Sequence, residues 1–445
     1  MQGCLSREHF SRRGLLSGFG AIGLLAAMRI EGRAQVRQAE VRTQSSAKAC
    51  IFINLNGAPS HVDTFDVKDG PWNAPDTDIV QTGQVTLNRT IFPNLTRIAG
   101  DLCLLRSVVS WEAAHDRGQF YMQTSHPANP AFIAESPHIG AVVAFELGKK
   151  DSKLPPFLAF NGAPRGAAFL GGRNEPMNAP ANQGGFSTIT HPFFGNASEQ
   201  RFRQRFALLE KLDSEIRTNP HDQLQANHAS YYSSARGMMY DPVISEVFKF
   251  SADDDGRYGN TGFGRSCIVA RNAVQSGQGA SFINLTRGGW DMHQRIFDRG
   301  YSGNLYDIGG DLDRAVGNLV SDLKASGHFE STLIVMMGEF GRTPGGLNAS
   351  GGRDHHKNAM CCAMLGGGVK GGRVIGATDA NGASVIDPGW SKDRPIYFED
   401  ITATIYSALG INWTRSLTDT PSGRRFEYVP FGSAGQYTSI QEVFG

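Results

Sequence analysis

The feature that most constrains the fold is a repeated alternation of short apolar runs with longer amphipathic stretches. Apolar runs of strand length occupy residues 50–55, 101–109, 155–160, 280–286, 331–337, 361–368 and 372–378. Stretches with helical periodicity occupy residues 136–148, 198–218, 262–277, 306–327 and 397–411. Strands that alternate with helices are typical of a parallel sheet with helices on both faces. We therefore predict an α/β fold built on a doubly wound, mostly parallel sheet.

Helix ends and one long polar region refine this prediction. Ser136 is the expected N-cap of the helix over 136–148, and Gly148 is its expected stop. A region rich in Gly, Asn and Pro begins near residue 160, and we predict loop insertions over a site around residues 160–235. The predicted globular domain spans residues 48–432.

The N-terminus is predicted to be an export signal. Arg12 and Arg13 precede an apolar stretch at residues 15–28 that is too short and too rich in Gly for a comfortable membrane span. Twin arginines before such a stretch are typical of a twin-arginine signal peptide, here residues 1–34, and a polar linker follows at 35–47. The alternative is a basic, amphipathic N-terminal helix. The signal predicts a protein of the periplasm or cell envelope with no stable membrane anchor after processing.

The charge balance and the cysteines argue against a nucleic-acid-binding protein and against a disulfide-rich protein. With 43 basic and 42 acidic residues the net charge is +1, so we expect no nucleic-acid partner, which would require a basic excess. Of the 6 cysteines, Cys4 would leave with the signal, whereas Cys50, Cys103 and Cys361 lie in or beside apolar runs. We therefore expect buried thiols rather than a disulfide framework.

Polar side chains follow four of the predicted strands. Residues 56–63 follow the first strand and residues 110–115 follow the second. Asp291 and His293 come after a third apolar run, and Glu339 comes after a fourth. Because ligands gather at the carboxyl ends of strands in such sheets, we expect the four segments to form one site at a common edge.

Asp291 and His293 are the first candidate metal ligands. A carboxylate and an imidazole so close together on a loop after a strand can chelate one cation, and His355 from a distant segment would close the coordination sphere. Such ligands predict a divalent ion such as Zn, Mn or Fe with water in an open position. In the alternative reading, Asp291 caps the following helix. The run Arg353–Asp354–His355 favours the metal, because surface solvation hardly explains it.

Glu339 and two arginines are further candidates for the site. Glu339 ends a very apolar strand, so it must be paired or coordinated if it is buried. In one reading Arg342 is its partner in an internal salt bridge. In the other, Arg342 and Arg353 hold a phosphate or sulfate as bidentate donors.

A series of short motifs resembles one known family. In chain order these are SRRGLL, LNGAPSHVDTFD, GFGRSCIVARNAVQSG, GGWDMH, GEFGRTP and GGRDHH. They resemble the exported bacterial family called domain of unknown function 1501, over about residues 50–430. That family is grouped with the alkaline phosphatase and sulfatase superfamily. The resemblance implies an alkaline phosphatase-like, doubly wound α/β core with a metal site at the strand ends.

The resemblance implies roles for individual residues. Superfamily members bind a first metal through an Asp and a His that match Asp291 and His293, and the metal histidine of related mutases matches His355. At the second metal site, Asn56 stands where members have an Asp. Glu339 replaces a second Asp there.

Two further departures concern chemistry directly. Phe340 stands where members have a metal-binding His, and Phe cannot ligate. His115 occupies the place of the nucleophilic Ser, Thr or Cys. The pattern therefore argues against a two-metal mechanism and against an ordinary covalent phosphoenzyme. The residues that would compensate, and that otherwise form a turn and helix cap, are His61, Asp63 and Asp66.

Two functions are compatible with these features. The first is an exported hydrolase in which a water or His115 attacks a phosphate or sulfate ester. Asp354 would orient the metal ligands, Glu339 would be a further ligand or a general base, and Arg342 and Arg353 would stabilise the anion. The second is a non-catalytic exported binding protein that keeps at most one structural metal and handles polysaccharide or an envelope partner.

Overall fold

A computed structural model describes residues 41–149, 151–179, 181, 199–219, 225 and 241–445 of the chain. The predicted signal peptide at 1–34 lies outside the described residues, as do residues 35–40 of the linker and much of the region 160–235. The predictions for these segments therefore remain predictions.

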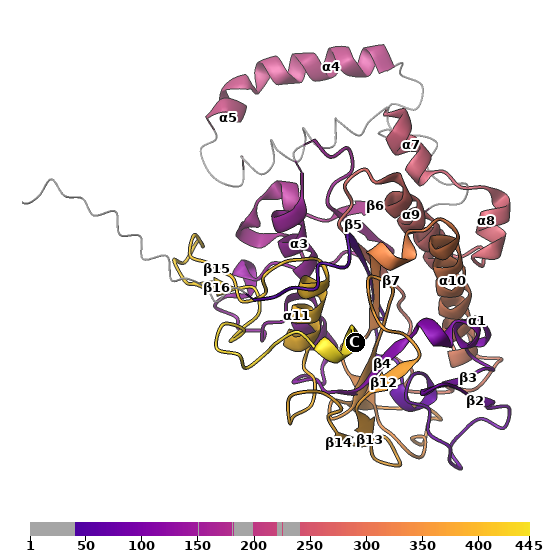
Figure 1. Cartoon of the computed structure of the whole chain (residues 1–445). Coiled ribbons are helices and arrows are strands. Elements are labelled where there is room, and N and C mark those ends of the chain that lie inside the picture. Colours follow the sequence, from indigo (N-terminus) through magenta and orange to yellow (C-terminus); the bar gives the residue numbers. More distant parts are fainter. Residues whose placement is uncertain (1–40, 150, 180, 182–198, 220–224, 226–240) are drawn as a thin grey trace, which may run out of the picture. The chain divides into compact units, whose positions relative to one another are not determined.

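The described chain is organised around one mixed sheet of 8 strands in the order β12-β4-β11-β8-β1-β7-β5-β6 (Figure 1). Neighbouring strands pair in parallel, except that β11 runs antiparallel to both β4 and β8. The predicted mostly parallel α/β sheet is confirmed. Because β11 runs the opposite way, the segment that enters it lies at the edge where the parallel strands end.

All strands of the sheet except β6 lie within or overlap the predicted apolar runs, and β6 lies in the region predicted to be loops. Their bounds are Ala49–Asn54 for β1, Cys103–Val108 for β4, Phe157–Phe160 for β5, Met177–Ala179 for β6, Phe282–Thr286 for β7, Thr332–Met337 for β8, Met360–Leu365 for β11 and Arg373–Ile375 for β12. All residues of β1, β8 and β11 are buried. Such uninterrupted burial is expected of central strands that are covered on both faces.

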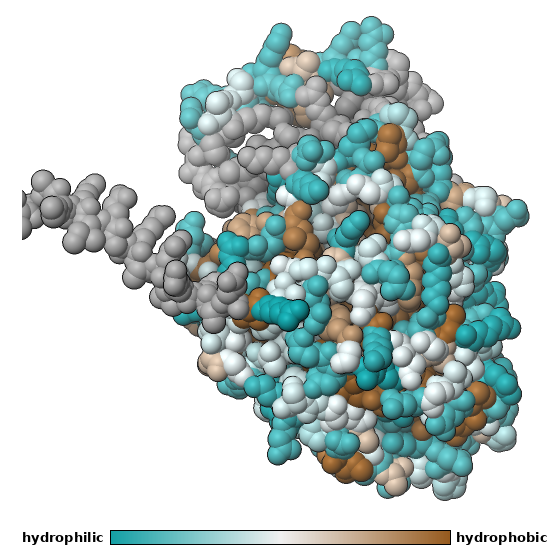
Figure 2. Space-filling model, in the orientation of Figure 1, coloured by the Kyte–Doolittle hydropathy of each residue, from teal (hydrophilic) through white to brown (hydrophobic). Residues whose placement is uncertain are grey.

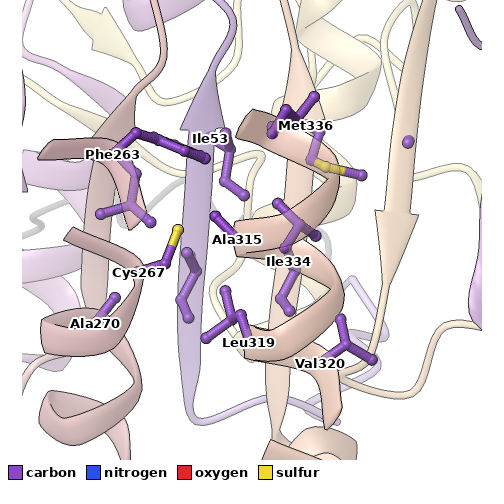
Figure 3. Close-up of a cluster of buried hydrophobic side chains, with 14 of the residues drawn as sticks. Ile53, Phe263, Cys267, Ala270, Ala315, Leu319, Val320, Ile334 and Met336 are labelled. Carbon is purple, nitrogen blue, oxygen red and sulfur yellow. The ribbon is translucent and has the colours of Figure 1, made fainter. Parts of the chain in front are cut away.

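One face of the sheet packs against helices α9 (Gly262–Ser276) and α10 (Leu305–Ala325). Figure 3 shows Cys267 of α9 and Leu319 of α10 in the same group of side chains as Ile53 of β1 and Ile334 of β8. These side chains belong to one buried cluster. Their burial is the main stabilising term on this face, at about 25 cal/mol per Å² of apolar surface removed from water.

The other face packs against helices α2 (His115–Thr124), α3 (Ile139–Leu147) and α11 (Phe398–Ala408). Alternate residues of β1, such as Cys50 and Phe52, join this second buried cluster. Because side chains alternate across a strand, each central strand supplies both clusters. Figure 1 shows α3 and α11 on one side of the sheet and α9 and α10 on the other, as the doubly wound arrangement requires.

The bounds of the helices were predicted less accurately than those of the strands. Helix α3 begins at Ile139, and its N-cap is His138, whose side chain accepts a hydrogen bond from the backbone N–H of Gly140. Ser136 is therefore not the cap. The next residue, Pro137, disfavours a helical conformation at Ser136. The helix predicted over 198–218 is two helices, α4 (Glu199–Leu212) and α5 (Ser214–Thr218).

Smaller elements complete the described chain. Four two-stranded sheets pair β2 (Ile79–Thr82) with β3 (Val85–Asn88), β9 (Gly341–Arg342) with β10 (His355–His356), β13 (Ala377–Thr378) with β14 (Val385–Asp387), and β15 (Ser416–Leu417) with β16 (Phe426–Glu427). The short helices are α1 (Pro93–Arg97), α7 (Pro242–Phe248) and α8 (Ala252–Arg257).

The surface residues, the helix lengths and the cysteines can be compared with the predictions. Figure 2 shows hydrophilic and hydrophobic residues interspersed over one face of the molecule. Among the residues that the structure describes, every helix is too short or too polar to cross a membrane. The cysteines at positions 50, 103, 267, 361 and 362 are buried free thiols, in agreement with the prediction for Cys50, Cys103 and Cys361.

Candidate metal centre

The candidate site is assembled at the edge where β1, β4, β7 and β8 end. The loop after β1 carries Gly57, and the loop after β4 leads into α2, whose first residue is His115. Asp291 follows β7 and Glu339 follows β8. Strand β10 begins with His355 and precedes the antiparallel β11. Segments far apart in the chain therefore reach one place because their strands end at the same edge.

Four of these side chains form a cluster. One ligand atom each from His115, Asp291, His293 and His355 lies within 4.8 Å of the others. The Nε2 atoms of His115, His293 and His355 lie 3.1, 2.9 and 3.5 Å from Oδ1 of Asp291. The Nε2 atoms of His293 and His355 are 3.1 Å apart. The predicted trio of Asp291, His293 and His355 is thus brought together, with His115 as a fourth member.

The other ring nitrogen of each histidine is hydrogen-bonded to an acceptor. Nδ1 of His355 donates to the carbonyl of Ala113 at 2.7 Å. Nδ1 of His293 donates to Asp354 at 2.8 Å. This is the contact expected of a residue that orients a metal ligand, as predicted for Asp354. Since a carbonyl or carboxylate oxygen only accepts, the proton sits on Nδ1 and the Nε2 lone pair points into the cluster.

His115 shows the same arrangement most clearly. Its Nδ1 donates to Oε1 of Glu339 at 2.6 Å. Its Nε2 is buried and has no hydrogen-bond partner, although Oδ1 of Asp291 lies 3.1 Å away. An unpartnered buried acceptor is costly, more so when it faces a carboxylate. Arg342 lies against the same carboxylate oxygen and offsets its charge, but a proton or a metal ion between Nε2 of His115 and Oδ1 of Asp291 would also satisfy the imidazole.

The ligand spacing fits a transition-metal ion. Imidazole nitrogens and carboxylate oxygens bind zinc at about 2.0–2.2 Å, which places the ligand atoms of a tetrahedral site roughly 3.3 Å apart. The distances from Asp291 to the three imidazoles, 2.9–3.5 Å, bracket that value. A set of three imidazoles and one carboxylate suits Zn, Mn or Fe rather than Mg or Ca, which prefer oxygen ligands.

Asp291 is held in its charged form. Burial favours the neutral carboxyl, but the hydrogen bond and charge of Arg342, together with His115 and His293, lower the pKa of Asp291 to about 2. Arg342 donates to Oδ1 of Asp291 at 2.5 Å. The carboxylate is therefore available as a ligand across the physiological pH range.

The pKa values of His115 and His355 are shifted in opposite directions. The hydrogen bond to Glu339 raises the pKa of His115. Burial lowers the pKa of His355, against the opposing effect of its hydrogen bond to the Ala113 carbonyl. His355 is therefore neutral at physiological pH, the form in which imidazole binds metals.

The cluster is open to solvent. The exposed fractions of the side chains are 46% for Asp291, 43% for His293, 31% for His115 and 26% for His355. A site that binds and converts a substrate needs such access, whereas a purely structural metal is usually enclosed.

Arg342 and Arg353, which were predicted to hold a phosphate or sulfate, both donate to groups of the protein instead. Arg342 is 1% exposed, and its donors are directed at Asp291, at Nε2 of His293, and at the carbonyls of Gly57, Ala58 and Arg353. The salt bridge considered for Arg342 therefore exists, but its partner is Asp291 rather than Glu339. The predicted bidentate hold on a phosphate would need free donors, which the contacts of Arg342 do not leave.

Arg353 and Asp63 form a buried ion pair outside the cluster. Arg353 is fully buried and donates to both carboxylate oxygens of Asp63, at 2.6 and 3.0 Å. Its other terminal nitrogen donates to the carbonyls of Thr343 and Gly345. The structure therefore separates both residues from their predicted roles, because Asp63 has no lone pair directed at the metal site and Arg353 has no donor directed at an anion.

The remaining second-site candidates make other contacts. Asn56 is exposed on the loop after β1, and its backbone carbonyl accepts from the N–H of Trp290. His61 donates to the carbonyl of Gly382, and Asp66 pairs with Lys68 and Arg106. The compensation proposed for His61, Asp63 and Asp66 is not what their contacts show.

Phe340 stands at one side of the cluster. Its buried ring lies 5.0 Å from that of His115 and 4.7 Å from that of His355, centroid to centroid. An apolar ring against two imidazoles leaves no ligand on that side, which agrees with a single ion.

Two contributors were missed by sequence reasoning. Gln119 of α2 donates to Oε2 of Glu339 at 2.7 Å, and the backbone carbonyl of Ala113 orients His355. Gln119 has a readable signal, since it lies four residues after His115 and thus on the same face of the helix. A backbone carbonyl has no sequence signal.

A mostly parallel α/β sheet with a histidine and carboxylate cluster at its carboxyl edge defines an α/β protein with a candidate metal centre. The chain belongs to the family described as protein of unknown function (DUF1501), which matches residues 47–438. The family prediction made from the short motifs is thereby confirmed. No curated protein matches the sequence.

Several solved structures are similar to the chain at low identity. One is the PsFucS1 sulfatase from Pseudoalteromonas sp., with 13% identity, a TM-score of 0.39, and coverage of 83% of this chain and 68% of that one. Another is a phosphonate monoester hydrolase from Silicibacter pomeroyi, with 14% identity, a TM-score of 0.37, and coverage of 82% and 74%. A third is alkaline phosphatase from the Antarctic bacterium TAB5, with 13% identity, a TM-score of 0.35, and coverage of 82% and 99%.

Proposed function

We propose that this protein is an exported, metal-dependent hydrolase of phosphate or sulfate esters. The observation that carries the proposal is the solvent-open cluster in which three imidazole Nε2 atoms converge on the Asp291 carboxylate. The proposed location, in the periplasm or cell envelope, rests on the twin arginines Arg12 and Arg13 before an apolar stretch.

The residues that would hold the ion are Asp291, His293 and His355. A divalent ion bound there would act as a Lewis acid, lowering the pKa of a water and polarising the ester. Asp354 and the Ala113 carbonyl fix the two ring orientations. Arg342 fixes Asp291 from the buried side. These contacts preorganise the ligands, so little reorganisation is needed when the ion binds.

The charge around the site bears on the substrate. Arg342 is directed at Asp291 and Arg353 at Asp63, so neither guanidinium offsets the charge of an anionic ester directly. The positive charge that would meet the ester is then that of the bound ion. We therefore expect the protein without metal to bind anionic esters weakly.

A turnover screen tests the proposal. Protein purified without chelator is stripped, reloaded with Zn, Mn or Fe, and assayed with aryl phosphates, aryl sulfates and sulfated or phosphorylated polysaccharides. We expect turnover of at least one class that requires metal and is lost in His293→Ala. Tight metal binding with no turnover of any ester would reject the hydrolase.

The second candidate is a non-catalytic exported binding protein with one structural metal. The specific observation in its favour is that four protein ligands are in reach, enough to close a tetrahedral site, while both nearby arginines are already paired. This candidate predicts a slowly exchanging ion, and binding of a surface polysaccharide or an envelope partner that survives in His293→Ala.

A further inference from the structure

We infer that His115 is a fourth metal ligand, placed by Glu339 as a positioning residue, rather than a nucleophile or base. This inference rests on the metal binding of the proposed function but not on its ester hydrolysis. It gives roles to two residues whose functions the sequence left open.

The position of His115 is that of a ligand. Its buried Nε2 has no hydrogen-bond partner and lies 3.1 Å from Oδ1 of Asp291. Its ring stands at 80° to the ring of His355, with centroids 4.5 Å apart. The two rings are therefore not stacked, and their Nε2 atoms both lie within 3.5 Å of Oδ1 of Asp291. A base acting on a substrate would instead present Nε2 to solvent.

Glu339 is saturated by protein donors. Its Oε1 accepts from Nδ1 of His115 at 2.6 Å and from the backbone N–H of Gly57 at 3.1 Å. Its Oε2 accepts from Gln119 at 2.7 Å. The side chain is fully buried. A carboxylate used in this way cannot serve as a general base in contact with water, and its hydrogen bonds offset the cost of burying its charge.

The contacts of Glu339 fix the first turn of α2. His115 and Gln119 are four residues apart in that helix, so both side chains lie on the same face and both bind Glu339. Gln119 also accepts from the amide of Asn54, at the end of β1, at 2.9 Å. Glu339 thereby links the ends of β1 and β8 to the helix that carries His115.

This arrangement is the one that tunes metal-bound histidines elsewhere. A carboxylate that accepts from the distal ring nitrogen fixes the tautomer and raises the basicity of the ligating nitrogen, and its loss typically weakens metal affinity 10- to 100-fold. His293 has an equivalent partner in Asp354, but that pair is largely exposed, with side chains 43% and 55% accessible. The buried Glu339 is therefore expected to have the larger effect.

Metal binding and ligand counting test the inference without any substrate. The stripped full-length protein is titrated with zinc by calorimetry, and the zinc-loaded form is analysed by X-ray absorption. We expect three imidazole ligands in the wild type and two in His115→Ala. We expect Glu339→Gln to keep three imidazoles while its affinity for zinc falls by about 10- to 100-fold. His328→Ala, which removes a histidine at the opposite edge of the sheet, should leave the number of imidazole ligands and the affinity for zinc unchanged.

The outcomes separate this inference from the proposed function. Wild-type affinity and three imidazoles in His115→Ala would overturn it, and so would unchanged affinity in Glu339→Gln. Should His115→Ala fail to fold, His115→Asn and Glu339→Gln give the same comparison. A wild type with three imidazoles around zinc and no ester turnover supports the inference while rejecting only the hydrolase.

Discussion

At the scale of single residues, Glu399 is the clearest source of pH dependence in stability. It is buried in α11 and accepts a hydrogen bond from Tyr121 of α2. Burial raises the pKa of Glu399 from 4.5 to about 8. The folded state therefore keeps a proton that the unfolded chain releases. Stability from this group is complete below pH 4.5 and is lost as the pH rises towards about 8.

We predict that Glu399→Gln removes this dependence. The free energy of unfolding in urea should fall between pH 5 and 8 more steeply in the wild type than in Glu399→Gln, because the amide has no proton to lose. Glu330→Gln, at an exposed position, serves as the control and should keep the wild-type slope. Equal slopes in all three proteins would show that Glu399 is ionised in the folded state.

The buried pair of Arg353 and Asp63 gives a second prediction at this scale. Asp63→Ala leaves a fully buried guanidinium without its partner, and we expect a loss of about 3–5 kcal/mol in the free energy of unfolding. Arg299→Ala breaks the exposed pair with Asp76 and should cost far less, because solvent screens an exposed ion pair. Similar costs for the two variants would mean that the pair is not buried in solution.

Arg342 and Arg353 show what could not be predicted from the sequence. The sequence identified Arg342 and Arg353 as polar groups at the site, yet both are buried ion-pair partners. The residue type and the neighbouring sequence allowed both an ion-pair role and an anion-binding role, since a guanidinium binds a carboxylate of the protein as well as a phosphate. Only the positions of Asp63 and Asp291 decide between the two.

At the scale of elements, the turn after β1 determines how closely the loop after β7 can approach. Gly57 has φ +104°, and a Cβ there would lie 2.6 Å from the backbone N of Asp291. We predict that Gly57→Ala displaces Asp291 and weakens zinc binding at least tenfold. Gly423→Ala is the matched control, because Gly423 also has positive φ, +71°, but open space around it. Calorimetric titration with zinc measures both, and unchanged affinity in Gly57→Ala would contradict the packing argument.

Element boundaries show which signals the sequence carries. The strands were predicted closely because buried central strands are continuous apolar runs. Helix α2 was not predicted as a helix, although it carries His115, because its sequence HDRGQFYMQT has little apolar periodicity. Its Gly118 lies against Glu339, where a Cβ would come within 3.1 Å of the glutamate side chain. Tertiary contacts, rather than a local pattern, place this helix.

At the scale of the whole molecule, the site follows from topology. Parallel strands end at one edge, so polar residues after β1, β4, β7 and β8 meet there without any local sequence signal linking them. This rule predicted that segment 110–115, Asp291, His293 and Glu339 meet at one edge, whereas His355 was added as a ligand because of its residue type and the family resemblance. The rule placed His115 at this edge but did not make it a metal ligand, because side-chain direction at the start of a helix depends on the residue at which the helix begins.

The measurement that tests the account most directly is the metal content of the chain. Stripped protein is equilibrated with zinc, freed of excess ion, and analysed for bound metal per chain. We predict one ion in the wild type and a large loss in Asp291→Asn and His293→Ala, with the fold retained by circular dichroism. An absence of bound zinc in the wild type, or undiminished zinc in both variants, would contradict it.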